Sequence, residues 1–583
     1  MAENNARDPR ISRFAASRLG PEQRARDIER LKSETFDVLV IGGGVVGAGA
    51  ALDAASRGLK VALVEARDLA SGTSSRATKL IHGGLRYLEQ LEFHLVREAL
   101  KERGLLLGEL APHLVRPVPL LIPIEHRVWQ RPFYGAGIML YDFLGTLFGT
   151  SRGMPLQKHF TRKGTRELFP SLRKDALVGS IKFHDAQVDD ARFVMTLART
   201  ALAQGAAITT STRVVDINKD EREVTGARVR DLESGEEFDV KASTVIGAVG
   251  VWSDDISEML HKKIGLHVRA SKGIHLLVPR SAISGDAGLF LFTEKSVLFC
   301  LPWGAHWLIG TTDTDWHLDR AHPAASSADI EYLLEHVNKV LERPLLKSDI
   351  EGVYAGLRPL LAGEDESTSK LSREHAVVEP MLGMMFVAGG KFTTYRVMAK
   401  DVVDVAVERL RKGRKSATEH MPLLGADGYQ TAWKNRAELA RRHRVSTAMV
   451  EHFLRRYGSL TVELLKMIDE DRSLAEALPN THEYFEVEIV YAALAEGALH
   501  LDDALTRRTR ISIETVHRGT ECAERAAELM AGVLGWDAST RKSEVEHYLA
   551  RVAAERESQQ MPDDQTADAA RLGAHDVRGL SGV

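Results

Sequence analysis

Three glycines, Gly42, Gly44 and Gly47, stand in G-x-G-x-x-G spacing near the start of the 583-residue chain. They follow a short β-branched run at 38–41 and precede an alanine-rich segment of helical composition. In this spacing the first glycine permits a tight turn, and the second lets backbone N–H groups approach a pyrophosphate. The third lets the helix and the strand pack closely. Because the helix N-terminus adds partial positive charge, the stretch predicts a phosphate-binding turn.

An acidic residue completes this unit. Residues 60–64 are predicted to form a second strand that ends at Glu65, where a carboxylate can accept a hydrogen bond from an adenosine ribose. A glycine-rich turn between buried elements would explain neither the three spaced glycines nor Glu65. The strand, helix, second strand and acid together predict a dinucleotide-binding domain, and the residues alone leave flavin and nicotinamide cofactors open.

Further polar residues lie in glycine-rich stretches later in the chain. Residues 71–89 contain a Ser/Thr run followed by HGGLRY, and residues 386–396 read as a buried strand, a double glycine, a lysine and a helix start. A second set of backbone N–H groups could therefore face a ligand there. Arg358 and Arg373 add two cations between them. Taken singly, each of these cations would be expected at the surface or in an ion pair.

Composition excludes several classes of protein. The chain has 44% hydrophobic and 27% charged residues, which is typical of a globular protein. Its net charge of −4 provides no overall electrostatic attraction to nucleic acid. Cys300 and Cys522, the only cysteines, form no C-x-x-C, so neither a disulfide framework nor a zinc site is expected. An acidic run at 313–319 lacks the glycine and glutamate of a calcium loop, so no metal is predicted.

Four regions follow from the patterning. Residues 1–35 are predicted to be a flexible extension and residues 36–420 the nucleotide-binding region with an interleaved substrate domain. Amphipathic segments of helical period predict an all-helical domain at 421–557, and a polar tail at 558–583 is predicted to be disordered. The N-terminus lacks the apolar core of a signal peptide, so a cytoplasmic location is expected.

One apolar segment, residues 133–148, is too short to span a bilayer and carries Asp142. Nine Lys/Arg against two acids surround it between residues 127 and 174. A basic flank beside an apolar segment can mark an interfacial anchor, although composition alone favours a core helix.

Taken together, these blocks resemble the FAD-dependent glycerol-3-phosphate dehydrogenases, the quinone-reducing type within the D-amino-acid-oxidase-like flavoproteins. The most specific matches are KLIHGGLRYLE, SKGIHLLVPR and GLRPLL, and the resemblance runs from about residue 36 to residue 555. It implies an α/β fold: a Rossmann-type FAD-binding domain with an inserted antiparallel β-sheet substrate domain, followed by a C-terminal all-helical domain.

The resemblance also assigns residues. The non-covalent FAD is expected to contact these positions: Gly42, Gly44, Gly47 and Glu65 at the ADP half; Ser74, Ser75, Lys79, Leu80 and His82 beside the flavin, with Gly250 and Trp252 bordering it; and Gly389, Gly390 and Thr393 around the ribityl chain and ring. The substrate site is expected to be lined by Arg86, Tyr87, His275, Arg358, Arg373 and Lys391. Several cations suit a phosphomonoester dianion.

The implied reaction is oxidation of sn-glycerol 3-phosphate, with hydride transfer from C2 to the flavin and removal of the hydroxyl proton by a base. His275 is a candidate for the base or for a hydrogen-bond donor, and Lys391 or Arg86 could stabilise the developing alkoxide. The implied partners are a membrane quinone, the membrane surface on the cytoplasmic side, and a second copy in a homodimer. The quinone requirement favours residues 133–148 as an interfacial anchor. The competing interpretations are an amine or amino-acid oxidase of the same fold and a non-catalytic flavin-binding interaction protein.

Overall fold

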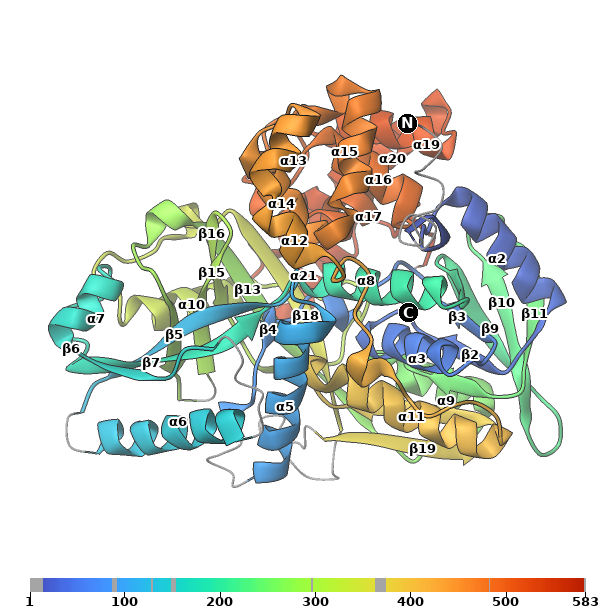
Figure 1. Cartoon of the computed structure of the whole chain (residues 1–583), viewed down its shortest axis with the longest axis horizontal. Coiled ribbons are helices and arrows are strands. Elements are labelled where there is room, and N and C mark those ends of the chain that lie inside the picture. Colours follow the sequence, from blue (N-terminus) through green and yellow to red (C-terminus); the bar gives the residue numbers. More distant parts are fainter. Residues whose placement is uncertain are drawn as a thin grey trace.

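The computed structural model describes residues 14–85, 92–126, 129–147, 154–294, 297–361, 374–481 and 483–580. Within them the chain forms two sheet regions side by side with a helical region above both (Figure 1). The expected α/β architecture with an inserted, largely antiparallel sheet and a C-terminal helical domain is confirmed.

A six-stranded sheet forms the nucleotide-binding domain. Its order is β19-β20-β12-β2-β3-β8, and all neighbours are parallel except β19 and β20. Its strands are β2 Val38–Ile41, β3 Val61–Val64, β8 Ala207–Thr209, β12 Val245–Gly247, β19 His375–Met381 and β20 Met384–Gly389. Every residue of β2 and β3 is buried, as expected for strands covered on both faces.

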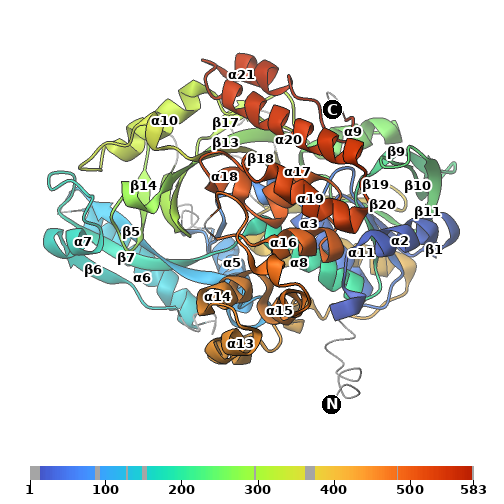
Figure 2. The same ribbon diagram turned by 90° about the horizontal axis from the view of Figure 1, so that it is seen from above.

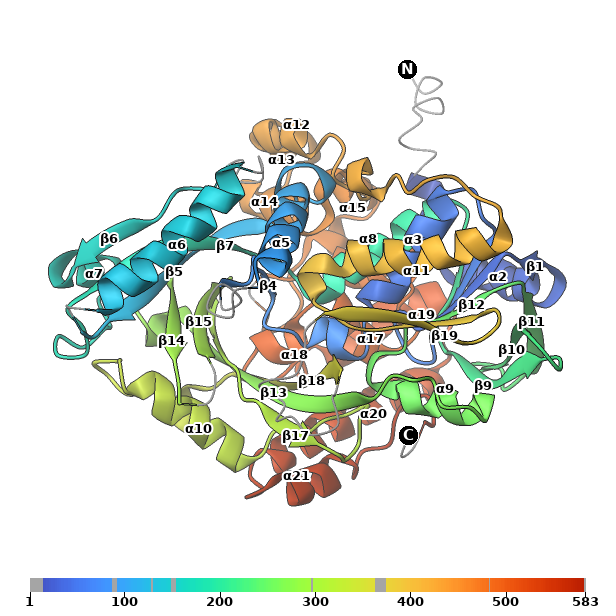
Figure 3. The ribbon, with the colours of Figure 1, turned by 90° about the horizontal axis from the view of Figure 1, so that it is seen from below.

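Helices and a small sheet cover the two faces of this sheet. One face packs on α3 Val45–Ser56, α8 Asp190–Ala203 and α11 Tyr395–Leu410. The other packs on α9 Ser253–Leu260 and on a sheet of β1 Thr35–Phe36, β9 Thr212–Lys219, β10 Val224–Asp231 and β11 Glu237–Ala242. The view from below shows α3, α8 and α11 lying together (Figure 3).

A ten-stranded sheet forms the second region, and among its pairs only β5 and β14 run parallel. Its strands are β4 Leu80–Ile81, β5 Arg116–Ile124, β6 Lys158–Thr161, β7 Gly179–Gln187, β13 Val268–Pro279, β14 Gly288–Phe292, β15 Val297–Trp303, β16 His306–Gly310, β17 Thr314–Trp316 and β18 Gly352–Leu361. Beside it lie α5 Phe93–Leu105, α6 Gln130–Leu147, α7 Arg162–Leu168 and α10 Ser327–Asn338. The chain enters this sheet twice, so the two domains are interleaved.

The helical region contains α12 Tyr429–Lys434, α13 Arg436–His443, α14 Thr447–Tyr457, α15 Thr461–Glu470, α16 Glu486–Ala495, α17 Leu501–Asp503, α18 Ile511–Glu514, α19 Ala523–Leu534 and α20 Ala538–Ser558. Gly458, with φ of +59°, separates α14 from α15 because its left-handed backbone ends the first helix. Asn435 separates α12 from α13.

The prediction that both ends of the chain are flexible is wrong for the terminal residues that the structure describes. The N-terminal region contains α2 Pro21–Ser33, whose Leu31 is fully buried and whose Asp27 accepts a hydrogen bond of 2.9 Å from Ile208 N. The C-terminal region contains α21 Asp564–Arg571, packed against α20 (Figure 2). The polar composition of both ends suggested disorder. Ion pairs and small buried apolar side chains such as Ala567 instead pack these ends against the rest of the protein.

Buried ion pairs join the helical region to the nucleotide-binding domain. Arg508 donates twice to Asp68, with 2.6 Å for each N–O pair, and Arg507 Nε donates to the same carboxylate at 2.5 Å. Asp68 and Arg508 are almost completely buried. Arg508 therefore depends on this one carboxylate in the loop after β3, whereas Arg507 also pairs with Asp502 and Asp503.

Asp68→Asn should lower the free energy of unfolding by about 3–5 kcal/mol, because it leaves the buried guanidinium group of Arg508 with a neutral partner. Denaturant unfolding measures the change. Asp239→Asn, which disturbs a half-exposed pair with Arg228, is the control and should cost about 0–1 kcal/mol. Equal, small losses in both variants would contradict the structural role of Asp68.

Candidate functional site

A cavity of about 870 Å³ lies between the two sheets. Ile41, Glu65 and Ala248 bring the carboxyl ends of β2, β3 and β12 to its wall. Strand ends of a parallel sheet are where this class of fold binds ligands. From the other side, β13 and β18 bring His275 and Arg358 to the same cavity. The cavity can therefore hold a dinucleotide on one side and a small substrate on the other.

The glycine turn has the geometry of a pyrophosphate cradle. Gly42 has φ of +106°, and a Cβ on Gly47 would lie 1.9 Å from Gly42 O, so the turn and the helix meet too closely for any side chain. A Cβ on Gly44 would meet only Ser74 Oγ, at 3.2 Å. Gly44 thus borders open space at the N-terminus of α3, where the ligand can approach the backbone.

Glu65 sits at the base of this cradle. Its carboxylate accepts hydrogen bonds from Gly43 N at 2.6 Å and Arg67 N at 2.8 Å, and burial raises its pKa. Each carboxylate oxygen keeps a lone pair for a ribose hydroxyl. Ser74 Oγ accepts from Val45 N at 3.0 Å, which fixes the Ser/Thr run against the first turn of α3.

Most of the expected residues lie at the cavity. Those that line it are Gly42, Gly44, Glu65, Ser74, Leu80, His82, Gly250, Trp252, His275, Arg358, Gly389, Gly390 and Lys391. Gly47, Ser75, Lys79 and Thr393 lie behind this wall, and Thr393 Oγ1 accepts from His82 N at 3.2 Å. Arg86, Tyr87 and Arg373 lie outside the described residues.

Lys79 is a supporting residue of the wall. It is fully buried, and its ammonium donates to Asp190 at 2.7 Å and to Ser75 O at 3.0 Å. Burial, with Arg510 adding to it, lowers its pKa to about 8, although Asp190 opposes the shift. The ammonium also lies 4.9 Å from the centre of the Tyr354 ring. Its contacts place it under the substrate side of the cavity.

His275 projects from β13 into the cavity. Its ring stacks on Tyr354, with centres 4.7 Å apart and 14° between planes, and its Nε2 hydrogen-bonds to Thr78 Oγ1 at 3.0 Å. Burial above all, then Arg358 and Lys79, hold its pKa well below the ordinary value, so the imidazole is neutral at neutral pH. Its buried Nδ1 has no hydrogen-bond partner among the described residues. A neutral ring in this position can accept a proton.

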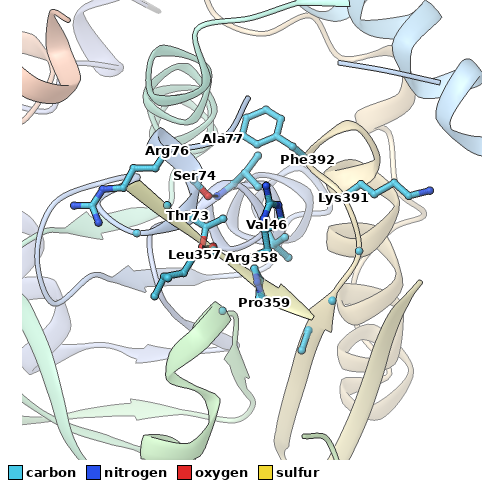
Figure 4. Close-up of a pocket in the computed structure, with 18 of the residues that line it drawn as sticks. Val46, Thr73, Ser74, Arg76, Ala77, Leu357, Arg358, Pro359, Lys391 and Phe392 are labelled. Atoms are coloured by element: carbon cyan, nitrogen blue, oxygen red, sulfur yellow. Dashed lines mark hydrogen bonds between the residues drawn. The ribbon is translucent and has the colours of Figure 1, made fainter. Parts of the chain in front are cut away.

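Arg358 lies beside it on β18, in register with Ser271 of β13. Its Nη2 donates to Thr311 Oγ1 at 2.9 Å and to Thr312 O at 3.1 Å, and its Nη1 lies 3.5 Å from Asp313 Oδ1. A Cβ on Gly273 would lie 2.5 Å from Nη2, so that glycine makes room for the guanidinium. Figure 4 shows Arg358 at the centre of the group and Lys391 extending away from it.

Thr78, Thr311, Asp313 and Tyr354 contribute to the site without having been predicted. Asp313 belongs to the acidic run that was considered for calcium; in the fold it faces Ser271 and Arg358. Thr78 and Tyr354 lie close to KLIHGGLRYLE and GLRPLL, the two motifs that were recognised, and this proximity was their signal in the sequence. The fold brings Thr78 to His275, and the pairing of β13 with β18 brings Tyr354 to it.

Tyr141 connects the site to α6. Its hydroxyl accepts from Gly83 N at 2.8 Å and from Arg103 at 2.9 Å, and donates to Asp185 at 2.8 Å. All three side chains are buried. Gly83 follows His82, so this network fixes the backbone of the cavity wall.

Comparison with known proteins agrees with this geometry. Residues 37–404 match the FAD dependent oxidoreductase family, and residues 416–541 match the C-terminal domain of alpha-glycerophosphate oxidase. A Mycobacterium tuberculosis protein named glycerol-3-phosphate dehydrogenase 2 is 54% identical over 97% of this chain and 96% of its own length. The chain belongs to the FAD-dependent glycerol-3-phosphate dehydrogenases.

More distant relatives extend the comparison of this dehydrogenase. The mitochondrial glycerol-3-phosphate dehydrogenase of Bos taurus is 36% identical over 90% of this chain and 74% of its own length. The crystal structure of glycerol-3-phosphate dehydrogenase from Bacillus halodurans complexed with FAD has a TM-score of 0.76 and 27% identity. It covers 92% of this chain and 98% of that one. The expected cofactor, FAD, is confirmed, and the cradle fits it.

Gly44→Val should release FAD, because the new side chain fills the space where the backbone meets the pyrophosphate. The ratio of flavin absorbance to protein measures the loss. Gly532→Val, on α19 where a Cβ meets nothing within 4 Å, is the control and should keep its flavin. Full flavin occupancy in Gly44→Val would contradict the assignment of the cradle.

Proposed function

We propose that this dehydrogenase oxidises sn-glycerol 3-phosphate to dihydroxyacetone phosphate and delivers the electrons to a membrane quinone. The observation that carries the proposal is the meeting of His275 and Arg358 on the wall of the cavity that holds the FAD cradle. The names of the relatives support the substrate.

The two residues have different parts in the proposed reaction. The guanidinium of Arg358, held by Thr311 and Thr312, binds the phosphate dianion and fixes the substrate in orientation. The neutral imidazole of His275 accepts the proton of the C2 hydroxyl while the C2–H bond breaks. Bound FAD supplies the acceptor for the hydride. Arg86, Tyr87, Arg373 and Lys391 remain proposed substrate residues, with Lys391 or Arg86 proposed to stabilise the alkoxide.

A quinone dissolved in lipid requires contact with a membrane, and α6 offers a surface for it. No helix in the described part of the chain has the length and apolarity to cross a bilayer. Instead α6 exposes Phe133, Met139 and Phe143, each 55–62% accessible, while Ile138 and Tyr141 face the core. The helix is thus apolar on both faces, which a fully solvated surface helix would not be.

Cations surround this face. Lys158, Arg162 and Lys163 are exposed on β6 and α7, which lie near α6 at the lower left of Figure 1. The helical region lies on the opposite side of the molecule in that view. We propose that α6 lies in the interface with its aromatic and Met side chains inserted and the cations on anionic headgroups. The proposed location is the inner face of the cell membrane, and the proposed assembly is a homodimer.

Arg358→Ala should raise the KM for glycerol 3-phosphate about 10–150-fold, because the phosphate loses a charged hydrogen bond worth about 1.5–3 kcal/mol. Steady-state kinetics with a dye acceptor measures it, with flavin content checked. Arg269→Ala, on the neighbouring strand and paired with Asp315, is the control.

Plain glycerol should be a poor substrate of the wild type. Equal turnover of glycerol and glycerol 3-phosphate would contradict the phosphate site.

Replacing Phe133, Met139 and Phe143 together by Glu should abolish co-sedimentation with vesicles of anionic lipid, because charged side chains do not enter the interface. The control carries Glu at Leu346, Leu382 and Val516, which are similarly exposed elsewhere. Undiminished sedimentation and quinone reduction in the α6 variant would refute this docking face, and salt should weaken wild-type binding.

A further inference from the structure

A second cavity, of about 50 Å³, lies between the loop after β3, helix α20 and the C-terminal region. Its walls carry a concentration of basic side chains: Arg67, Arg76, Arg507, Arg551, Arg571 and Arg578 together with His322, His547 and His575. Three acids, Asp502, Glu544 and Asp576, also line it. Figure 2 shows α20 and α21 side by side over this part of the molecule.

Four of the six arginines have carboxylate partners. Arg507 pairs with Asp68 at 2.5 Å and Arg578 with Asp503 at 2.7 Å. Arg551 pairs with Asp502 at 2.8 Å, and Arg67 lies 3.4 Å from Asp576. The third acid of the wall, Glu544, pairs with His500 at 2.8 Å. The acids that line the cavity are therefore all engaged.

Arg76 and Arg571 have no such partner. Neither has a carboxylate within 4 Å among the described residues; Arg76 donates only to Ala321 O, at 2.9 Å, and Arg571 only reaches His322 Nδ1, at 3.4 Å. Glu555 and Asp502 act on Arg571 only from a greater distance. Burial, then Arg507, Arg571 and Arg551, lowers the pKa of Arg76 to about 10, and burial likewise lowers that of Arg571.

Two further atoms in this wall are left without a partner. Arg551 Nη1 and His547 Nδ1 are buried and make no hydrogen bond among the described residues. Arg76 lines both cavities, and its guanidinium projects away from Arg358 and Lys391 (Figure 4). Buried cations and donors without partners are costly, and the cost falls when an anion joins them.

We propose that this cavity binds a small divalent oxyanion, either inorganic phosphate or the phosphate group of a small phosphomonoester. At about 10–15 Å³ for each water, the cavity of about 50 Å³ holds about three to five waters or one such tetrahedral group. Guanidinium groups from three separate elements would then converge on one anion, the arrangement that suits phosphate best.

We expect an anion bound in this second cavity to slow the release of FAD from the large cavity. The C-terminal region that forms its outer wall also reaches the large cavity, where Leu580 lines the wall. Asp576 contacts both Arg67 and His322, and Arg67 lines both cavities. An anion under this region fixes it in place and so closes the adenosine side of the cradle. This inference is independent of the proposed substrate.

The test uses the FAD-loaded enzyme with inorganic phosphate, compared with chloride at the same ionic strength. Phosphate should raise the midpoint of thermal unfolding by about 2 °C or more and slow the release of FAD about tenfold. Arg571→Gln should lose both effects and should melt no lower than the wild type in phosphate-free buffer, since it removes a buried charge that has no carboxylate within 4 Å among the described residues. Arg541→Gln, exposed on α20, should keep both effects.

Phosphate could also bind at the proposed substrate site, so Arg358→Ala is the second arm. Effects that persist in Arg358→Ala and vanish in Arg571→Gln support the second site. Effects that vanish in Arg358→Ala, persist in Arg571→Gln, or equal those of chloride overturn it. If Arg571→Gln does not fold, Arg76→Gln replaces it in the same comparison. Isothermal titration with phosphate then measures the stoichiometry of binding directly.

Discussion

The carboxylate of Asp190, fully buried at the N-terminus of α8, is the interaction on which the rest of the structure depends. It accepts hydrogen bonds from Ala77 N at 3.0 Å and Lys79 Nζ at 2.7 Å, and it pairs with Arg510 of the helical region. One side chain thus ties the loop at the cavity wall to a helix of the FAD domain and to the C-terminal domain. Together with Asp189, which also pairs with Arg510, its negative charge compensates the two cations that are buried there.

This carboxylate also supports the substrate side of the cavity. Lys79, which Asp190 neutralises, lies under the ring of Tyr354, and Tyr354 stacks on His275. A column of four side chains therefore leads from the helical region to the proposed base. The helical domain at 421–557 helps to position the site, even though Leu580, which lies beyond it, is the one described residue after Phe392 and Met398 that lines the larger cavity.

The sequence predicted those features that depend on local spacing. The turn at Gly42–Gly47 and the acid at Glu65 are neighbours in one strand-helix-strand unit, so their pattern could be recognised without knowledge of the fold. The contacts of Asp190 could not be predicted, because its partners Lys79 and Arg510 are more than a hundred residues away on either side. Asp313 was considered only as part of a calcium loop, which was rejected, because the sequence does not show that the fold brings it to Arg358. Residues 558–580 read as disordered because ion pairs such as Arg578–Asp503, unlike apolar periodicity, leave no pattern in a single sequence.

The phenol of Tyr141 has a consequence for how α6 can move. Three hydrogen bonds join this one hydroxyl to Gly83, Arg103 and Asp185 in a place that water does not reach. Tilting or sliding of α6 must either break all three or carry the backbone next to His82 with it. A displacement of α6 at the surface of the protein must therefore also move the backbone that lines the cavity beside His82.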